Sequence, residues 1–247
     1  MLAPPFTDPA RLDDVLRTQG HAVLSPQALQ SLLHAAPDAL RAWQPFWDRL
    51  PPDAYLRDGG RYRRRRHANY VITDGRVQPV PHRAHWQPVE YNALHGGIER
   101  WFEPVEPALE NDPLWMPLLR LLAARADALR GPQTWYVEAH AFRIDTTDGI
   151  GRPTPEGAHR DGVDLVSVLL LQRHDVKGGE SRVFDVNGPQ GLRFTLSEPG
   201  TLLLLDDTRV IHETTPIQPE GELGWRDTLV VTLRKGGFQG PADPLHR

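Results

Sequence analysis

The second half of the chain is a series of short apolar runs of strand length. These runs, which lie between Thr134 and Lys235, are TWYVEAHAFRI, DLVSVLLLQ, SRVFDV, GLRFTL, TLLLLDD and RDTLVVTLRK. Turn sequences such as KGG, NGP and EPG separate several of them. Many short strands at this spacing are typical of a β-barrel or a jelly roll. The sequence therefore predicts a mainly β core with helices packed outside it.

Two helices are predicted in the first half of the chain, so the expected fold class is α+β. Ser25 can cap a helix that starts at Pro26 and continues through QALQSLLHAA, where apolar residues follow helical spacing. A second segment of helical apolar spacing covers residues 114–129 and is followed by Gly131 and Pro132, which end helices. The stretch between the two helices is less regular and rich in aromatic and basic residues.

Length and composition fit one globular domain. The 247 residues exceed the usual domain size, but β-barrels and sandwiches of about 200 to 250 residues often form a single domain. A hydrophobic fraction of 39% with seven Trp residues allows a real core. We therefore expect one domain over residues 1–247, in which a helical and mixed part over 1–131 packs on a jelly-roll core over 132–236.

Charge, cysteine content and apolar runs exclude several classes of protein. A formal charge of -4 gives no reason to expect a nucleic-acid or anionic membrane partner. The sequence contains no cysteine, which excludes disulfides, thiolate ligands and a Cys nucleophile. The first residues do not resemble a secretory signal, and the apolar runs are far shorter than the roughly 18 residues that span a bilayer. We expect a cytoplasmic protein in which His, Asp or Glu must hold any metal.

The first candidate site contains His159 and Asp161, which follow the loop sequence GIGRPTPEG and precede the run DLVSVLLLQ. In extended backbone, positions i and i+2 point to the same face. A His-x-acid triplet alone is a weak signal, because chance predicts about one in a chain of this composition. His212, after the run TLLLLDD, offers a third ligand. Two His and one carboxylate with open positions form the facial triad of non-haem Fe(II) enzymes, and zinc is the competing metal.

A second feature is the strand-like sequence GWRDTLVVTLRK. Arg226 and Thr228 would share one face of this strand. A buried guanidinium beside a hydroxyl can hold a carboxylate through paired, charge-assisted hydrogen bonds. The sequence therefore places a candidate carboxylate site after the candidate metal ligands.

The order of these motifs resembles a known enzyme family. HRDG is followed by GGES with FD, by LLLDDTRVIHETTPI and by WRDTLVVTLRK, and PEGAHRDG, VEAHAFRI and HWQPVEYNALHGGIERWFEP extend the match upstream. The chain resembles the Fe(II)- and 2-oxoglutarate-dependent dioxygenases over roughly residues 60 to 235. More narrowly, it is similar to the bacterial group that contains free L-amino-acid hydroxylases of the L-isoleucine dioxygenase type and biofilm- and stress-related homologues. The resemblance implies a double-stranded β-helix, a cupin-like jelly roll.

The resemblance also implies roles for individual residues. His159, Asp161 and His212 would bind Fe(II), and Arg226, helped by Thr228, would bind the distal carboxylate of 2-oxoglutarate. Dioxygen would be the other cosubstrate, with ascorbate as the reductant in vitro. Such enzymes convert the keto acid to succinate and carbon dioxide while they hydroxylate an unactivated C–H bond or oxidise a thioether. The partner would be a small molecule, in this group a free L-amino acid such as Ile, Leu or Met, and the oligomeric state is left open.

An amino-acid substrate would need partners for its carboxylate and ammonium groups and an apolar pocket. Several polar residues near the motifs compete for these roles, and Arg143 is the most interesting of them. The candidates are Arg143, His140, Glu156, Gln87, Asn92 and one arginine of the run YRRRRH that begins at Tyr62.

Two other functions stay open. A non-catalytic metal-binding jelly roll with a stress or biofilm regulatory role would need the metal ligands but no clamp for a keto acid. A zinc hydrolase in the same barrel would need an additional general base, and none is obvious in the sequence. The combination of the triad with Arg226 favours the dioxygenase.

Several polar residues have a simpler interpretation. The run Arg63–Arg66 could be a nuclear signal or a nucleic-acid patch, but flanking aromatic and β-branched residues favour a strand with arginines on both faces. Asp206 and Asp207 are interpreted as a turn tied to Arg209 rather than as a second carboxylate pair near the metal. The isolated histidines are interpreted as surface or satisfied core residues: His21, His34, His82, His85, His95, His174 and His246.

Overall fold

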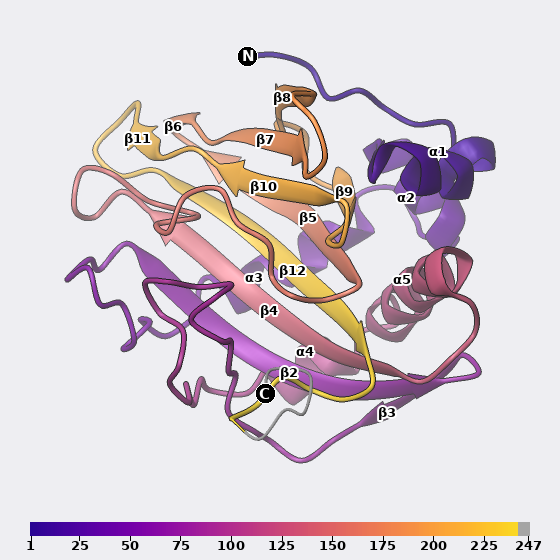
Figure 1. Cartoon of the computed structure of the whole chain (residues 1–247). Helices are drawn as coiled ribbons and strands as arrows, with labels where there is room; N and C mark the ends of the chain where they lie inside the picture. The colour runs from indigo at the N-terminus through magenta and orange to yellow at the C-terminus, as the bar shows by residue number, and fades with distance from the viewer. Residues whose placement is uncertain (242–247) are drawn as a thin grey trace.

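A seven-stranded antiparallel sheet forms the largest layer of the structure, a computed structural model that describes residues 1–241 (Figure 1). The strand order is β1-β9-β5-β12-β4-β2-β3. The strands are β1 (His21–Leu24), β2 (Arg63–Thr73), β3 (Arg76–Pro79), β4 (Trp135–Asp145), β5 (Leu165–His174), β9 (Leu202–Asp206) and β12 (Trp225–Lys235). The predicted arginine-rich strand is therefore confirmed as β2, next to β4 near one edge of the sheet.

Two smaller sheets cover part of one face of this large sheet (Figure 1). One has the order β10-β7-β8, and the other pairs β11 with β6. Their strands are β6 (Val176–Gly178), β7 (Glu180–Asp185), β8 (Gly191–Thr195), β10 (Val210–Thr214) and β11 (Ile217–Pro219). Apolar residues of the facing layers, such as Val183, Phe194 and Leu205, pack together between them. The predicted mainly β jelly roll is confirmed.

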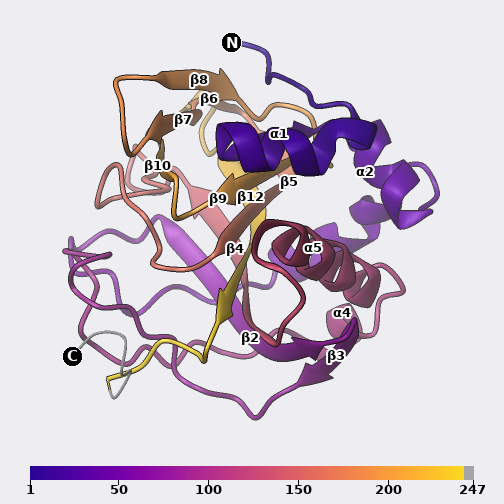
Figure 2. The same cartoon turned by 45° about the vertical axis from the view of Figure 1, so that its right-hand side comes forward.

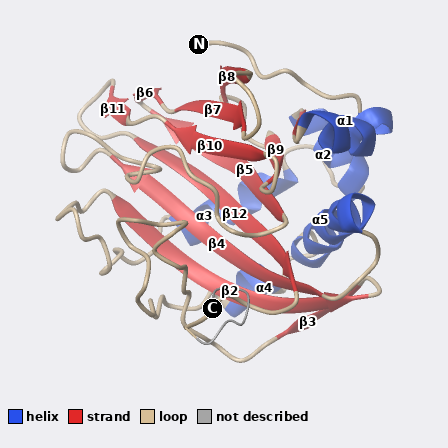
Figure 3. Cartoon of the chain, viewed as in Figure 1, coloured by secondary structure: helices blue, strands red, loops and turns tan. Residues whose placement is uncertain are grey.

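The helices pack on the opposite face of the large sheet (Figures 2 and 3). They are η1 (Pro9–Arg11), α1 (Leu12–Gln19), α2 (Pro26–Leu33), η2 (Ala39–Trp43), α3 (Gln44–Trp47), α4 (Pro107–Glu110) and α5 (Trp115–Arg130). Their apolar side chains form the main core with Ala139, Leu169 and Val231 of the sheet. None of the described helices is long and apolar enough to cross a membrane.

Both predicted helices are confirmed, with one difference at an end. Ser25 caps α2 by accepting from the Ala28 amide at 3.2 Å. α2 ends at Leu33, three residues before the end of the predicted segment, because His34 adopts a left-handed conformation (φ 50°). The N-terminal part also supplies β1, β2 and β3 to the large sheet. The single domain with a boundary near residue 131 stays a prediction.

Strand register aligns the side chains that face the smaller sheets. Along one row, Arg65 pairs with Phe142, and Phe142 pairs with Thr228. Along the next row, His140 pairs with Val230. Because side chains alternate along a strand, the residues between these positions point into the helix-covered core. This register places a polar and aromatic surface between the two layers.

Candidate metal centre and its cavity

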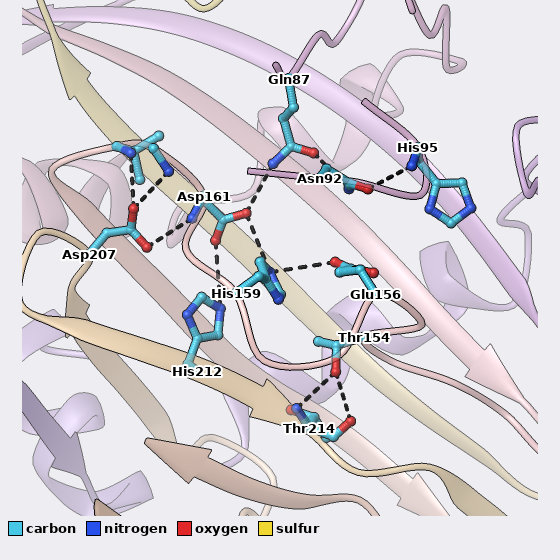
Figure 4. Close-up of polar contacts among 12 residues, drawn as sticks. Gln87, Asn92, His95, Thr154, Glu156, His159, Asp161, Asp207, His212 and Thr214 are labelled. Carbon is cyan, nitrogen blue, oxygen red and sulfur yellow. Dashed lines mark hydrogen bonds and ion pairs between the residues drawn. The ribbon is translucent and has the colours of Figure 1, made fainter. Parts of the chain in front are cut away.

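The three predicted metal ligands converge at one point (Figure 4). His159 and His212 form an antiparallel bridge between the loop before β5 and strand β10, with reciprocal backbone bonds of 3.0 and 2.9 Å. Nε2 of His159 lies 3.8 Å from Oδ1 of Asp161, and Nε2 of His212 lies 3.6 Å from Oδ2. Nδ1 of His159 donates to the Gly157 carbonyl at 2.9 Å, which leaves Nε2 as the acceptor. This donor set fits a divalent cation with open coordination positions.

The electrostatics of the triad also fit a cation. Burial and the neighbouring His159 hold the pKa of His212 well below its ordinary value, so the ring is in the neutral form that binds metals. Burial opposes protonation of His159, but the carboxylates of Asp161 and Glu156 raise its pKa above the ordinary value. Two carboxylates therefore make this point attractive to positive charge.

Asp207 holds the ligand loop by its backbone. Its carboxylate accepts from the amides of Asp161, Gly162 and Val163 at 3.0, 2.8 and 3.1 Å (Figure 4). Burial and the nearby Asp161 charge raise the pKa of Asp207 to about 7. The metal would partly cancel that repulsion when it binds Asp161.

Asp206 and Asp207 were predicted to form a turn bound to Arg209, but neither side chain binds the Arg209 guanidinium. Asp206 pairs with Arg130, while the guanidinium of Arg209 donates to the carbonyls of Arg17 and Thr18. The acidic pair does form a turn, because the Arg209 amide donates to the Asp206 carbonyl at 2.9 Å. The Asp207 carboxylate binds the ligand loop instead of Arg209.

Replacing Asp207 with Asn is expected to weaken metal binding by about 10- to 100-fold, the usual cost of losing a partner of a ligand. The Asn side chain keeps one acceptor oxygen, but its NH2 group would face a backbone N–H that donates to the second carboxylate oxygen in the native protein, so that hydrogen bond would be lost. Calorimetric titration with Mn(II) measures the effect. Asp175→Asn, on a half-exposed side chain, is the control. Equal affinity in the two variants would contradict this role of Asp207.

Gln87 contacts Asp161 from the other side. Its Nε2 donates to Oδ1 of Asp161 at 3.1 Å (Figure 4). Its Oε1 accepts from Nη2 of Arg100 at 2.9 Å and from Asn92 at 3.2 Å. Two donors on Oε1 fix the amide orientation, so the NH2 group must point at the carboxylate. Gln87 and Asn92, predicted as substrate contacts, therefore lie beside the metal ligands.

Arg226 is a buried cation that lines the same cavity as the triad. The residue is 2% exposed, and its Nε and Nη2 have no hydrogen-bond partner within residues 1–241. Burial and the nearby Arg173 lower its pKa to about 9. Thr228 lines the cavity on the same face of β12. An unpaired guanidinium with free donors fits a carboxylate ligand.

The other predicted residues divide into two groups. His140, Glu156, Gln87 and Asn92 line the cavity. Arg143 does not, because it points to the opposite face of β4. There it binds Asp227 at 2.8 and 2.7 Å, and Asp48 at 2.8 Å. The structure gives no support for Arg143 as a substrate contact.

A second group of buried donors lies on the large sheet. His67, His85, Glu138 and His140 have ligand atoms within 4.8 Å of one another, so they could hold a metal ion. The rings of His67 and His140 are stacked, 4.5 Å apart and 6° from parallel, so their lone pairs do not converge. Arg65 also donates to Nδ1 of His140 at 2.7 Å. The triad is the better metal site on both counts.

Arg100 and Glu138 line the cavity although neither was predicted as a site residue, and His85, interpreted from the sequence as a surface or satisfied core residue, lines it as well. Glu138 carries a usable signal, because it shares strand parity with His140. Arg100 and His85 carry none, since they pair across an irregular segment. Among the other isolated histidines, His95 is fully buried, and its ring nitrogens have no hydrogen-bond partner in the described part of the chain. His246 lies outside that part.

The chain is similar to several known proteins. The family model of the 2OG-Fe dioxygenases matches residues 44–232. A bsmA homologue from Methylobium petroleophilum is 52% identical, with a TM-score of 0.91 over 97% of this chain and 98% of that chain. IDO from Bacillus thuringiensis is 17% identical, with a TM-score of 0.76 over 96% and 100% of the two chains. The Fe(II)/α-ketoglutarate-dependent dioxygenase TqaL is 21% identical, with a TM-score of 0.69 over 94% and 90%. Curated proteins gave no match.

Proposed function

Because this chain belongs to the 2OG-Fe dioxygenase family, we propose that it oxidises a free L-amino acid, such as Ile, Leu or Met, by hydroxylation or sulfoxidation. Family membership makes the protein an oxygenase that uses Fe(II), 2-oxoglutarate and dioxygen. The observation that carries the proposal is one cavity that contains the triad, the unpaired Arg226 and further charged groups of both signs.

The residues around the metal would position the reactants. His159, Asp161 and His212 would hold Fe(II) through two imidazole nitrogens and one carboxylate. Arg226 would bind the distal carboxylate of 2-oxoglutarate, with the Thr228 hydroxyl as a second donor. When bound, Fe(II), 2-oxoglutarate and dioxygen supply the oxidation, which yields succinate and carbon dioxide as one oxygen atom enters the substrate. The protein orients the target carbon and limits the access of water.

The remaining cavity lining supports a zwitterion with an aliphatic side chain. It carries guanidinium groups from Arg63, Arg65 and Arg100 and the carboxylate of Glu156. Apolar residues complete it: Ile144, Val163, Val166, Val168 and Val230. A ligand with a carboxylate, an ammonium group and an apolar end uses all three kinds of lining.

The alternative is a non-catalytic metal-binding jelly roll with a stress or biofilm regulatory role. Such a protein needs no guanidinium kept unpaired at the cavity. Arg226 therefore favours the enzyme, because a buried cation without a partner destabilises a fold unless a ligand compensates it.

The test is product analysis with each proteinogenic L-amino acid. Purified protein receives Fe(II), 2-oxoglutarate and ascorbate in air, and mass spectrometry detects an amino acid that has gained one oxygen atom. We expect the gain for one or a few aliphatic or thioether amino acids, and none when 2-oxoglutarate is omitted. Succinate formation without any oxidised amino acid would show an active iron site with another class of substrate.

A further inference from the structure

Three buried arginines, Arg63, Arg65 and Arg100, form what we call the arginine wall of the cavity. They are 6%, 3% and 1% exposed, and all three line the same cavity as the metal triad. Two come from β2 and the third from the segment that bridges His85. Three like charges buried together repel one another and must be compensated.

Two of the three arginines have their own compensation. Nε of Arg63 binds Oδ2 of Asp53 at 2.7 Å, and Nη1 of Arg65 lies 3.9 Å from the same oxygen. The guanidinium of Arg65 also lies between two aromatic rings, 3.7 Å from the centre of Phe102 and 4.3 Å from that of Phe142. Arg63 and Arg65 are therefore held in place by the protein itself.

Arg100 differs from both, because no carboxylate of the described residues lies within hydrogen-bond distance of its guanidinium. Across residues 1–241 the one hydrogen-bond partner of its guanidinium is the neutral amide oxygen of Gln87, and its Nε has none. Burial and repulsion by Arg63 lower its pKa to about 10, which still leaves it charged at neutral pH. Arg100 is the cation of the wall that lacks an anion.

The charge of the wall can be counted. Glu138 is the second buried anion beside Asp53, and it accepts from His67 and His85 at 3.2 Å each. Burial lowers the pKa of both imidazoles, that of His85 to about 4, so they are neutral donors at neutral pH. Within the wall, three guanidinium groups face two carboxylates, so the wall has one more positive than negative charge; the other glutamate of the cavity, Glu156, lies at the metal ligand His159.

Glu156 provides the opposite charge near the metal. Its Oε1 lies 3.5 Å from Nε2 of His159, and its Oε2 is buried without a hydrogen-bond partner among the described residues (Figure 4). Glu138 already has three donors, since Asn69 also approaches it at 3.4 Å. Of these two glutamates, Glu156 is therefore the one with a carboxylate oxygen available to accept a hydrogen bond from a ligand.

We propose that Arg100 binds the carboxylate of the amino-acid substrate and that Glu156 binds its ammonium group. This inference rests on the proposed function and deepens it. The two sites add one positive and one negative charge, so the bound ligand is a zwitterion with an uncharged side chain. Acidic and basic amino acids would bring a buried charge without a partner, and the cavity selects against them.

The test is calorimetric binding under argon to protein loaded with Mn(II) and 2-oxoglutarate. The probes are the proteinogenic L-amino acids, followed by the carboxamide and the N-acetyl derivative of the tightest binder. We expect neutral aliphatic amino acids to bind best, and both derivatives to bind about 30-fold more weakly or worse. Arg100→Gln should weaken binding of the amino acid to a similar extent but leave the affinity for its carboxamide little changed. Glu156→Gln should likewise weaken binding of the amino acid but leave the affinity for its N-acetyl derivative little changed.

The control variants are Arg64→Gln, on the other face of β2, and Glu103→Gln on the surface. If Arg100→Gln weakened binding no more than Arg64→Gln, the carboxylate assignment would be wrong while the amino-acid proposal stood. If Glu156→Gln lost Mn(II) in a separate titration, Glu156 would be a metal ligand and its assignment here would be wrong. Binding by no amino acid would overturn the amino-acid proposal and this inference together.

Discussion

Asp161→Ala is expected to abolish iron-dependent succinate formation while the protein stays folded. Loss of an outer partner of a ligand costs about 10- to 100-fold, so removal of a ligand should cost more than about 100-fold. The fold should persist, because the Asp161 side chain is 17% exposed and Asp207 holds the loop through its backbone. Succinate release and the thermal unfolding midpoint measure the two effects.

The matched control is Asp14→Ala, on an exposed helical carboxylate with a surface ion pair. It should change neither succinate release nor the unfolding midpoint appreciably, because exposed pairs contribute little. His159→Ala should behave like Asp161→Ala. Full activity in either ligand variant would rule out this triad as the iron site.

Arg226→Met is expected to weaken 2-oxoglutarate binding selectively. Truncating one partner of a buried, hydrogen-bonded charge pair costs about 2–5 kcal/mol, which is about 30- to 4,000-fold in Kd. The affinity for Mn(II) alone should stay the same, because no hydrogen bond or ion pair among the described residues joins Arg226 to the three ligands. Titration of 2-oxoglutarate into the Mn(II)-loaded protein measures the first effect, with the exposed Arg193→Met as the control.

The same variant separates a ligand-binding role from a structural one. Without 2-oxoglutarate, Arg226 is a buried cation with two unpaired nitrogens, so a Met of similar length should leave the Tm unchanged or raise it. Thr228→Val should weaken the binding of 2-oxoglutarate by a smaller amount, about 0.5–1.5 kcal/mol for the loss of one hydrogen bond. A fall in Tm with unchanged affinity for 2-oxoglutarate would assign Arg226 to the fold instead.

Strand and helix signals in this sequence are local, which explains why the core could be predicted. The apolar runs from Thr134 onward became β4, β5, β7, β8, β9 and β12. α5 lies within one residue of its predicted bounds, because Gly131 ends it with a positive φ of 82°. These features depend on spacing and on turn residues that stand next to each other in the chain.

The alternation of side chains along β4 explains why Arg143 does not reach the cavity. His140 and Arg143 are three positions apart, so one strand cannot point both toward the cavity. β12 pairs with β4 from Trp225 to Lys235 and keeps His140 inside, which places Arg143 beside Asp48 and Asp227. Parity excludes one of the two residues, but only the packing of the sheets decides which.

The cavity wall formed by Arg100 and Gln87 could not be predicted for a different reason. Both residues lie in an irregular segment between β3 and α4, where no apolar period fixes the direction of a side chain. Their positions depend on distant partners. Gln87 reaches Asp161 across 74 positions of sequence, and the His85–Arg100 bridge closes the segment. Sequence spacing carries no information about such contacts.

The most direct test of the proposed chemistry is succinate release from 2-oxoglutarate by purified protein with Fe(II) and ascorbate, in air and under argon. We predict succinate in air only, stimulated by at least one small substrate, and its loss in His212→Ala although that variant remains folded. Succinate that forms equally under argon, or that His212→Ala still produces, would contradict oxygen-dependent turnover at this metal centre.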